Sequence, residues 1–327
     1  MALKAYWGRR IASSLLVLAV VLVLNFFLFR ILPGDPVSAI IDPRFSPQAK
    51  EELAALFGLD RPMGEQFLLY VKQMLTFNFG VSFLSQRPVW DEIRSRLPNT
   101  LILLSSAMAI SALLGIYLGV IAAAKRGGFI ERLVLWAGAI SFSFPSFFIQ
   151  LVMLLLFAFA MPIFPLRGSV SIPPPPPGWP AMIDYIWHMV LPVSSLVILG
   201  FGSWALYVRN LMVKVLGEDF VFLARAKGLP QRLILWRHAF RSILPPIVTI
   251  IFLSLPGVVS GAVITETVFS LHGVGRFLLE SVTGQDYPAA GAAFFLLALL
   301  TVICNLLADL AYGFVDPRIG LERKMER

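Results

Sequence analysis

Six apolar runs constrain this chain more than any other feature of its sequence. Each is long enough to cross a hydrocarbon layer of about 30 Å, which takes roughly 20 helical residues. Because backbone polar groups inside lipid must be satisfied within the segment, runs of this length predict helices. We expect membrane spans at 11–29, 101–124, 133–162, 189–208, 243–267 and 289–314.

The composition agrees with a membrane protein. Of 327 residues, 58% are hydrophobic and 14% are charged, too few charges for the surface of an ordinary soluble domain. Lys4, Arg9 and Arg10 precede the first run, as in a cleaved signal, but the run exceeds a usual signal core and no small-x-small site follows. We therefore interpret it as a span. The third run contains Pro145, which predicts tilt or a kink.

The charges predict an orientation. With the N-terminus inside, the inner segments hold 17 Lys and Arg against six acids, and the outer segments hold 10 against 11. Cytoplasmic loops carry such an excess of basic residues. We therefore expect both termini in the cytoplasm and the basic segment 209–242 on the same side.

The outer loop after the first span, residues 33–98, is too long for a simple turn. "SPQAKEELAALFG" predicts a short helix, with Ser46 as its cap and Gly58 as its stop. A second helix follows, and we expect both helices on the outer surface. The apolar face of the second helix is predicted to comprise Phe67, Leu68, Val71 and Leu75. Further along, "RGSVSIPPPPPGWP" favours a stiff extended conformation, either as a spacer or as a docking segment.

The residues that usually carry chemistry are sparse. No GxxxxGK[ST] motif occurs, and His188, His238 and His272 have no neighbours at metal-ligand spacing. Glu266 and Asp309 lie near opposite ends of the fifth and sixth runs, where carboxylates can reach the interface. We expect them to anchor or pack helices rather than relay ions. The chain is therefore predicted not to be an enzyme.

A basic, bent segment lies between the fourth and fifth runs. "LARAKGLPQRLILWRHAFRS" holds five Lys or Arg and no acid. Gly228 is suited to end a first helix and Pro230 to begin a second, which carries an apolar stripe of Leu233, Trp236 and Phe240. Such a segment can dock in a partner's groove or rest on anionic lipid, and its residues alone leave the two readings open.

Motifs along nearly the whole chain resemble one family of transport proteins. "FRILPGDP", "FGLDRP", "RPVWDEIRSRLPNTLIL", "SFPSFF", "EDFVFLARAKGLPQRLILWRHAFRSILPPIVT", "ETVFSLHGVGR", "QDYPAA" and "DPRIG" occur in the family's order. They are similar to permeases of ATP-binding-cassette importers for dipeptides, oligopeptides and nickel, in the DppB/OppB-like branch. The general Glu-Ala-Ala loop pattern of importers is only partly kept: Phe222, Leu223 and Ala224 stand at those three positions.

The resemblance implies an all-α integral membrane protein of type I importer architecture. It has six transmembrane helices, a long outer loop after the first and a cytoplasmic coupling helix between the fourth and fifth. The N-terminal tail and first span occupy 1–32, the outer helical region 33–98 and the permease core 99–327, with a coupling loop at about 209–242.

The resemblance also implies partners and contact residues. Two cytoplasmic ATPase subunits are expected to hold ATP and Mg²⁺, and a related second permease is expected to complete a heterodimer in the cell membrane. A binding protein outside the cell membrane is expected to deliver the substrate. Neither nucleic acid nor a cofactor on this chain is expected. The expected ATPase-coupling residues are Ala224, Arg225, Ala226, Lys227, Gly228 and Leu229. The expected docking residues for the binding protein are Ser46, Phe57, Gly58 and Asp60.

The expected activity is uptake of di- and oligopeptides. Relatives that carry oligosaccharides or nickel keep those substrates open as alternatives. A proton-coupled secondary transporter is the alternative of a different class, and a membrane receptor that transports nothing is a further one.

Overall fold

The computed structural model describes residues 2–31, 47–48, 62–260 and 262–315. Over these residues the regular elements are helices, and the only strand-like pairing is a single bridge between Val81 and Pro88. The all-α prediction is confirmed for this part of the chain. The helices are α1 (Ala2–Ile31), α4 (Met63–Leu75), α5 (Val89–Ala124), α6 (Phe129–Ser143), α7 (Ser146–Leu154), α8 (Trp179–Val215), α9 (Asp219–Ala226), α10 (Gln231–Leu233), α11 (Phe240–Ser260), α12 (Ala262–Val268), α13 (Val274–Thr283) and α14 (Tyr287–Val315), with π-helical turns η1 (Leu155–Ala160) and η2 (Ile234–Ala239).

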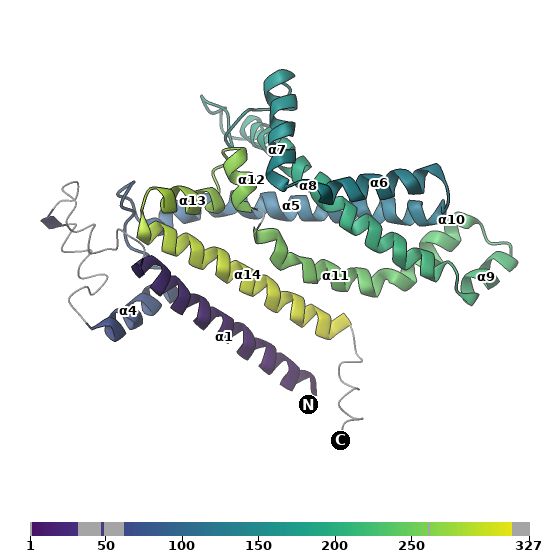
Figure 1. Ribbon diagram of the computed structural model, residues 1–327, viewed down its shortest axis with the longest axis horizontal. Helices are drawn as coiled ribbons and strands as arrows, with labels where there is room; N and C mark the ends of the chain where they lie inside the picture. The colour runs from purple at the N-terminus through teal and green to yellow at the C-terminus, as the bar shows by residue number, and fades with distance from the viewer. Residues whose placement is uncertain (1, 32–46, 49–61, 261, 316–327) are drawn as a thin grey trace.

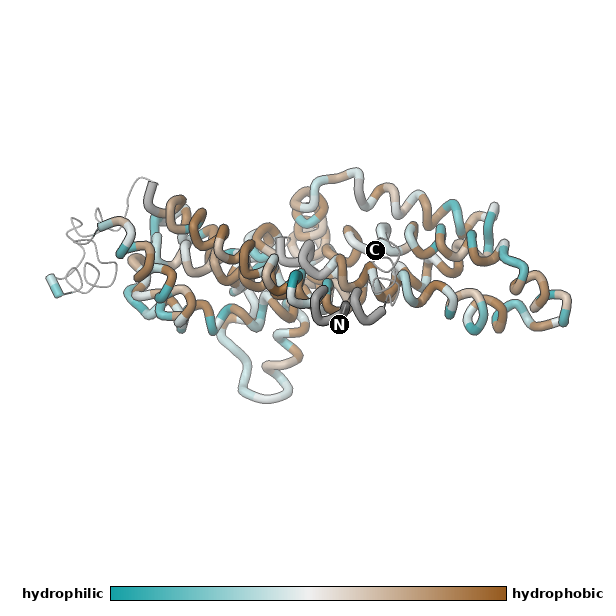
Figure 2. Tube along the Cα trace, turned by 90° about the horizontal axis from the view of Figure 1, so that it is seen from below, coloured by the Kyte–Doolittle hydropathy of each residue, from teal (hydrophilic) through white to brown (hydrophobic). Residues whose placement is uncertain are grey.

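The molecule is elongated, with α4 and α13 toward one end and α9 at the other, while α7 stands across its long axis (Figure 1). We call these the α4 end and the α9 end. Hydrophobic residues dominate the long helices between them, and hydrophilic segments gather toward both ends (Figure 2). On α1 the apolar side chains face outward: Leu15, Leu16 and Leu24 are each more than 60% exposed. In water that surface would be costly, whereas lipid covers it at no cost.

Four helices are long and apolar enough to cross a membrane, over Trp7–Phe29, Val89–Ala124, Trp179–Val215 and Tyr287–Ala311. The first three of these ranges contain the first, second and fourth predicted runs, and the last contains the sixth run except for its final three residues. The third run forms a bent pair that adds a fifth candidate. The fifth run falls within α11 and α12, and residue 261 between them lies outside the described residues. Four or five candidate spans are thus found among the described residues, and the total of six stays a prediction.

The bend predicted at Pro145 is present and sharp. The segments Phe129–Ser141 and Ser146–Ala160 meet at 102°. Proline lacks an N–H and disfavours helical geometry at the residue before it, and Phe144 is accordingly extended, with φ −112° and ψ 143°. The chain therefore turns, and α7 stands away from α6 in Figure 1.

Glycines bring α5, α8 and α6 into close contact. A Cβ atom built on Gly115 would lie 2.3 Å from Trp204 Cβ, and one on Gly119 would lie 2.7 Å from the Ala205 carbonyl oxygen. A Cβ on Gly202 of α8 would lie 2.2 Å from Ser141 Oγ of α6. Small residues permit such approach of helix backbones in membranes, where dispersion contacts rather than water drive association.

A second group of helices comprises α1, α14 and α11. Near the α4 end, the Asn25 side chain donates a hydrogen bond to the Gly291 carbonyl at 3.0 Å. At the opposite ends of the same two helices, Arg10 and Asp309 form an ion pair at 3.0 Å. The packing role predicted for Asp309 is thereby confirmed. Because both contacts join α1 to α14, they fix the relative register of the two helices.

Candidate functional site

The predicted break at Gly228 is a helix C-cap. Gly228 has φ +72°, a conformation that costs other residues about 1 kcal/mol or more, and its N–H donates to the Arg225 carbonyl at 2.9 Å. The Leu229 N–H donates to the Ala224 carbonyl at 3.3 Å. These two bonds form a Schellman motif, which ends α9 and turns the chain toward α10.

One face of α9 is buried and the other is open. Val221 and Ala224 pack on Ile234, so α9 and η2 form one small unit. On the opposite side Phe222 and Leu223 are 74% and 55% exposed. Apolar side chains that are this exposed on a polar loop mark a contact surface. The structure therefore brings Ala224 to the inside of the unit and leaves its neighbours available for contact.

The basic side chains of this segment all face solvent. The five are Arg225, Lys227, Arg232, Arg237 and Arg241. Together with the exposed Phe222, they give the α9 end a surface that is both basic and apolar.

Two residues of the apolar stripe predicted on the second helical piece lie together, and the buried face of this piece is a different one. Trp236 and Phe240 do contact each other, with ring centroids 5.4 Å apart, but Trp236 remains 37% exposed. The buried positions are instead Ile234 and Ala239, five residues apart. The cause is the π-helical turn η2, whose wider winding places such residues on one face.

The small unit made of α9 and η2, called the α9 unit from here on, is packed against the ends of three long helices. A buried cluster joins α5, α8, η2 and α11 next to it, so movement of the unit relative to these helices would break tertiary contacts. Its members are Val120, Ala123, Val208, Met212, Ala239, Ile243 and Ile247.

An ion pair ties α6 to α8 near the same end. The Arg209 side chain donates from Nε to Glu131 Oε1 at 2.8 Å, and the Gly127 N–H donates to Glu131 Oε2 at 2.6 Å. The carboxylate of Glu131 thus closes the turn before α6 and also links α6 to α8. The sequence placed these residues in inner basic segments without predicting that they pair.

At the far end of the bundle, Glu266 organises a buried polar network. Its Oε1 accepts a hydrogen bond from Thr100 Oγ1 at 2.6 Å, and its Oε2 accepts one from the Arg276 N–H at 3.0 Å. Thr100 in turn accepts one from the Val274 N–H at 2.9 Å. The predicted packing role is confirmed. The expectation that Glu266 reaches the membrane interface is wrong, because its side chain is fully buried among α5, α12 and the start of α13.

Gly273 leaves the space that this network needs. A Cβ atom at this position would lie 2.1 Å from Glu266 Cδ. The motif "ETVFSLHGVGR" therefore contains both the buried carboxylate, Glu266, and the glycine that leaves room for it, Gly273.

The face of α4 that contacts the bundle overlaps the predicted one in part, because Phe67 and Val71 contact the bundle. Leu68 and Leu75 are 67% and 54% exposed, whereas Gln66 and Met74 are buried. The rings of Phe67 and Tyr70 pack on Phe26 of α1, at 5.3 and 5.4 Å between centroids. Aromatic packing on α1, rather than the aliphatic stripe, therefore sets the rotation of α4. The predicted docking residues Ser46, Phe57, Gly58 and Asp60 lie outside the described residues.

Two family models match this chain. Residues 115–321 match the binding-protein-dependent transport system inner membrane component, and residues 4–104 match the N-terminal membrane component of the same systems.

Named relatives are similar over nearly their full length. A probable peptide ABC transporter permease, y4tP of Sinorhizobium fredii, is 34% identical over 96% of this chain and 98% of its own. The dipeptide transport system permease DppB of Escherichia coli K12 is 34% identical over 90% and 93%. The oligopeptide transport system permease AppB of Bacillus subtilis is 30% identical over 97% and 99%.

The apolar helices and these matches establish an all-helical, multi-pass membrane protein. The chain belongs to the family of binding-protein-dependent transport system inner membrane components.

Proposed function

We propose that this chain is a permease subunit of an ATP-driven importer for di- and oligopeptides. The names of its relatives support the substrate class, since they are described as permeases for peptides, dipeptides and oligopeptides. In this proposal six helices span the membrane, and the excess of basic residues supports cytoplasmic placement of both termini and of the α9 end. The region from 33 to 98, including α4, then lies outside.

The observation that carries the proposal is the α9 unit. It presents Phe222 and Leu223 to the cytoplasm, is capped at Gly228, and continues directly into α8 and α11. A partner that grips this unit can move both spans as a body. We assign the grip to one of two ATPase subunits, which together hold ATP and Mg²⁺, so that nucleotide binding favours one permease state over the other.

The remaining partners follow from the same assembly. A related second permease completes the pathway as a heterodimer, and a substrate-binding protein delivers peptide from outside. We place its docking surface on the outer region and keep Ser46, Phe57, Gly58 and Asp60 as the residues to test. This chain contributes no catalytic residue, and the ATPases perform the hydrolysis.

The test compares two glycines in one loop. Gly228→Val forces a β-branched residue into φ +72°, whereas Gly217→Ala changes a glycine before α9 whose new Cβ meets only ordinary contact at 3.4 Å. In proteoliposomes with the whole complex, Gly228→Val should keep ATP hydrolysis but lose peptide uptake, and Gly217→Ala should keep both. Charge reversal at Arg225 together with Lys227 should act like Gly228→Val.

Equal peptide uptake in all variants would contradict the assignment of the loop. The substrate class is tested separately, by the ATPase stimulation that the binding protein produces with trialanine, an oligosaccharide or Ni²⁺. Stimulation by the sugar or the metal alone would contradict the peptide assignment and leave the loop assignment standing.

A further inference from the structure

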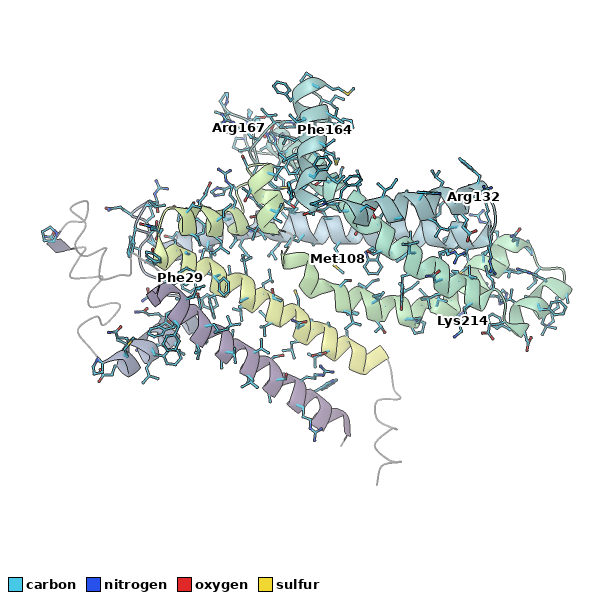
Figure 3. All side chains as sticks on the ribbon, in the orientation of Figure 1. Phe29, Met108, Arg132, Phe164, Arg167 and Lys214 are labelled. Atoms are coloured by element: carbon cyan, nitrogen blue, oxygen red, sulfur yellow. The ribbon has the colours of Figure 1, made fainter. Side chains whose placement is uncertain are left out.

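A cavity of about 310 Å³ lies between α5, α8 and α11. Met108, one of its lining residues, is labelled near the centre of the molecule in Figure 3, between the ribbons of α5 and α11. The lining residues lie in the interior of each of the three helices, away from their ends. Those that bear on its chemistry are Ser111, Ser203, Trp204, Tyr207 and Ser254.

Two of the four hydroxyls that line this cavity, those of Ser111 and Ser254, donate their protons to helix carbonyls and can only accept from a ligand. Ser111 Oγ donates its proton to the Met108 carbonyl at 3.0 Å, and Ser254 Oγ donates to the Ile250 carbonyl at 2.8 Å. A serine hydroxyl has one proton and two lone pairs, so each oxygen keeps acceptor capacity toward the cavity. Ser203 is exposed on the α8 side. The cavity therefore suits a ligand rich in N–H donors.

The lining carries no Lys, Arg, His, Asp or Glu among the described residues. An ammonium or carboxylate would enter such a space without a counter-charge, which is costly at membrane depth. An uncharged amide has no such cost, and the Trp204 and Tyr207 rings add apolar surface beside it. Donor groups without net charge are what the backbone of a peptide offers in its interior.

We infer that this cavity is a binding subsite for the peptide backbone on the transport pathway. The inference rests on the proposed function and adds to it the residues of this chain that touch the substrate. Recognition of backbone N–H groups by Ser111 and Ser254, with no charged partner for side chains, means that this subsite accepts peptides of varied sequence.

The first test is cysteine accessibility in the assembled complex. The natural Cys304 on α14 is replaced by serine, and single cysteines are placed at Ser203 or Ser254. The matched control is Ser105→Cys, which is exposed on α5 but does not line the cavity. A membrane-impermeant thiol reagent should label the two cavity cysteines and not the control, and trialanine delivered by the binding protein should protect them.

Three other results would overturn the inference. Failure to label the cavity positions would show that water does not reach them. Equal protection by trialanine at Ser105→Cys would show a global effect. Labelling in the isolated chain that disappears in the complex before peptide is added would show that the second permease fills the cavity. Trialanine uptake by the Cys304→Ser parent is measured alongside, so that loss of the proposed function is seen separately.

The second test removes the acceptors. Ser111→Ala with Ser254→Ala should lower trialanine uptake roughly 5- to 30-fold, the factor that one or two kcal/mol represents. The Ser105→Ala control should transport normally. Normal uptake by the double variant would contradict a hydrogen-bonding role for these hydroxyls.

Discussion

Replacing Gly273 by alanine should destabilise the protein by collision rather than by backbone strain. Gly273 has φ −122° and ψ 171°, which alanine adopts freely. The new Cβ, however, would lie 2.1, 2.2 and 2.3 Å from Cδ, Oε2 and Oε1 of Glu266. Real atoms do not approach so closely, so the carboxylate must leave its position.

The size of the effect follows from what the carboxylate leaves behind. The Thr100 hydroxyl and the Arg276 N–H would both lose their acceptor. Each buried donor left without a partner costs about 1–3 kcal/mol, so the two together should cost about 2–6 kcal/mol. Because Glu266 is fully buried, water does not replace either bond.

Heat resistance in detergent measures this cost. Membrane proteins of this kind unfold irreversibly, so the fraction of dispersed protein that remains after stepped heating is the suitable quantity. Gly273→Ala should fail at a clearly lower temperature than the parent. The control is Gly64→Ala on α4, where a new Cβ meets nothing within 4 Å.

A double variant isolates the collision. In Glu266→Ala the carboxylate is absent, and adding Gly273→Ala should then change little. The reasoning is refuted if Gly273→Ala behaves like Gly64→Ala, or if it destabilises the Glu266→Ala protein as much as it destabilises the parent.

Three further predictions concern the helix contacts. Gly115→Leu should abolish recovery of folded protein, because its Cβ alone would lie 2.3 Å from Trp204 Cβ and 2.6 Å from the Phe201 carbonyl oxygen. Size-exclusion profiles check this, with Gly8→Leu as the control because a Cβ at Gly8 meets nothing within 4 Å. Arg209→Met should lower the heat resistance more than Arg209→Met with Glu131→Gln, since the single change leaves the carboxylate beside the Gly127 turn without its cation; the reverse order would be inconsistent with pairing. Arg10→Asp should weaken the α1 contact by less than about 1 kcal/mol, because the Arg10 side chain is 44% exposed, and Asp309→Arg in the same chain should restore heat resistance.

Hydropathy located the long helices well and their ends poorly. The second run was predicted to start at 101, but α5 begins at Val89. The fourth was predicted to end at 208, but α8 continues to Val215. Hydropathy marks the part of a helix that can lie in hydrocarbon, and the polar turns beyond it keep the same backbone geometry.

Local backbone rules were the most reliable guide to the site. Gly228 and Pro145 were each assigned from the conformational limits of one residue type, and both act as predicted. The apolar face of α4 was assigned from spacing alone and is confirmed only in part, since Phe67 packs on the bundle whereas Leu68 and Leu75 are exposed. Which face of a helix is buried depends on partners such as Phe26, and a π turn changes the spacing itself.

Pairings between distant segments were outside the reach of one sequence. The segment "KRGGFIER" does not indicate that its Glu131 pairs with Arg209. Likewise "LPNTLIL" does not indicate that its Thr100 pairs with Glu266. The nearest signal was indirect: a carboxylate within an apolar run requires partners, and the glycines that follow Glu266 indicate a close approach.

Photo-crosslinking from position 222 tests the central claim most directly. A photoreactive phenylalanine analogue replaces Phe222, and the control position is Leu253 on α11, which is 57% exposed. If an ATPase subunit binds the α9 unit, irradiation of the assembled transporter should crosslink position 222 to that subunit. Position 253 should yield no such product. Crosslinks from position 222 to lipid alone, in a complex that still imports peptide, would contradict the account.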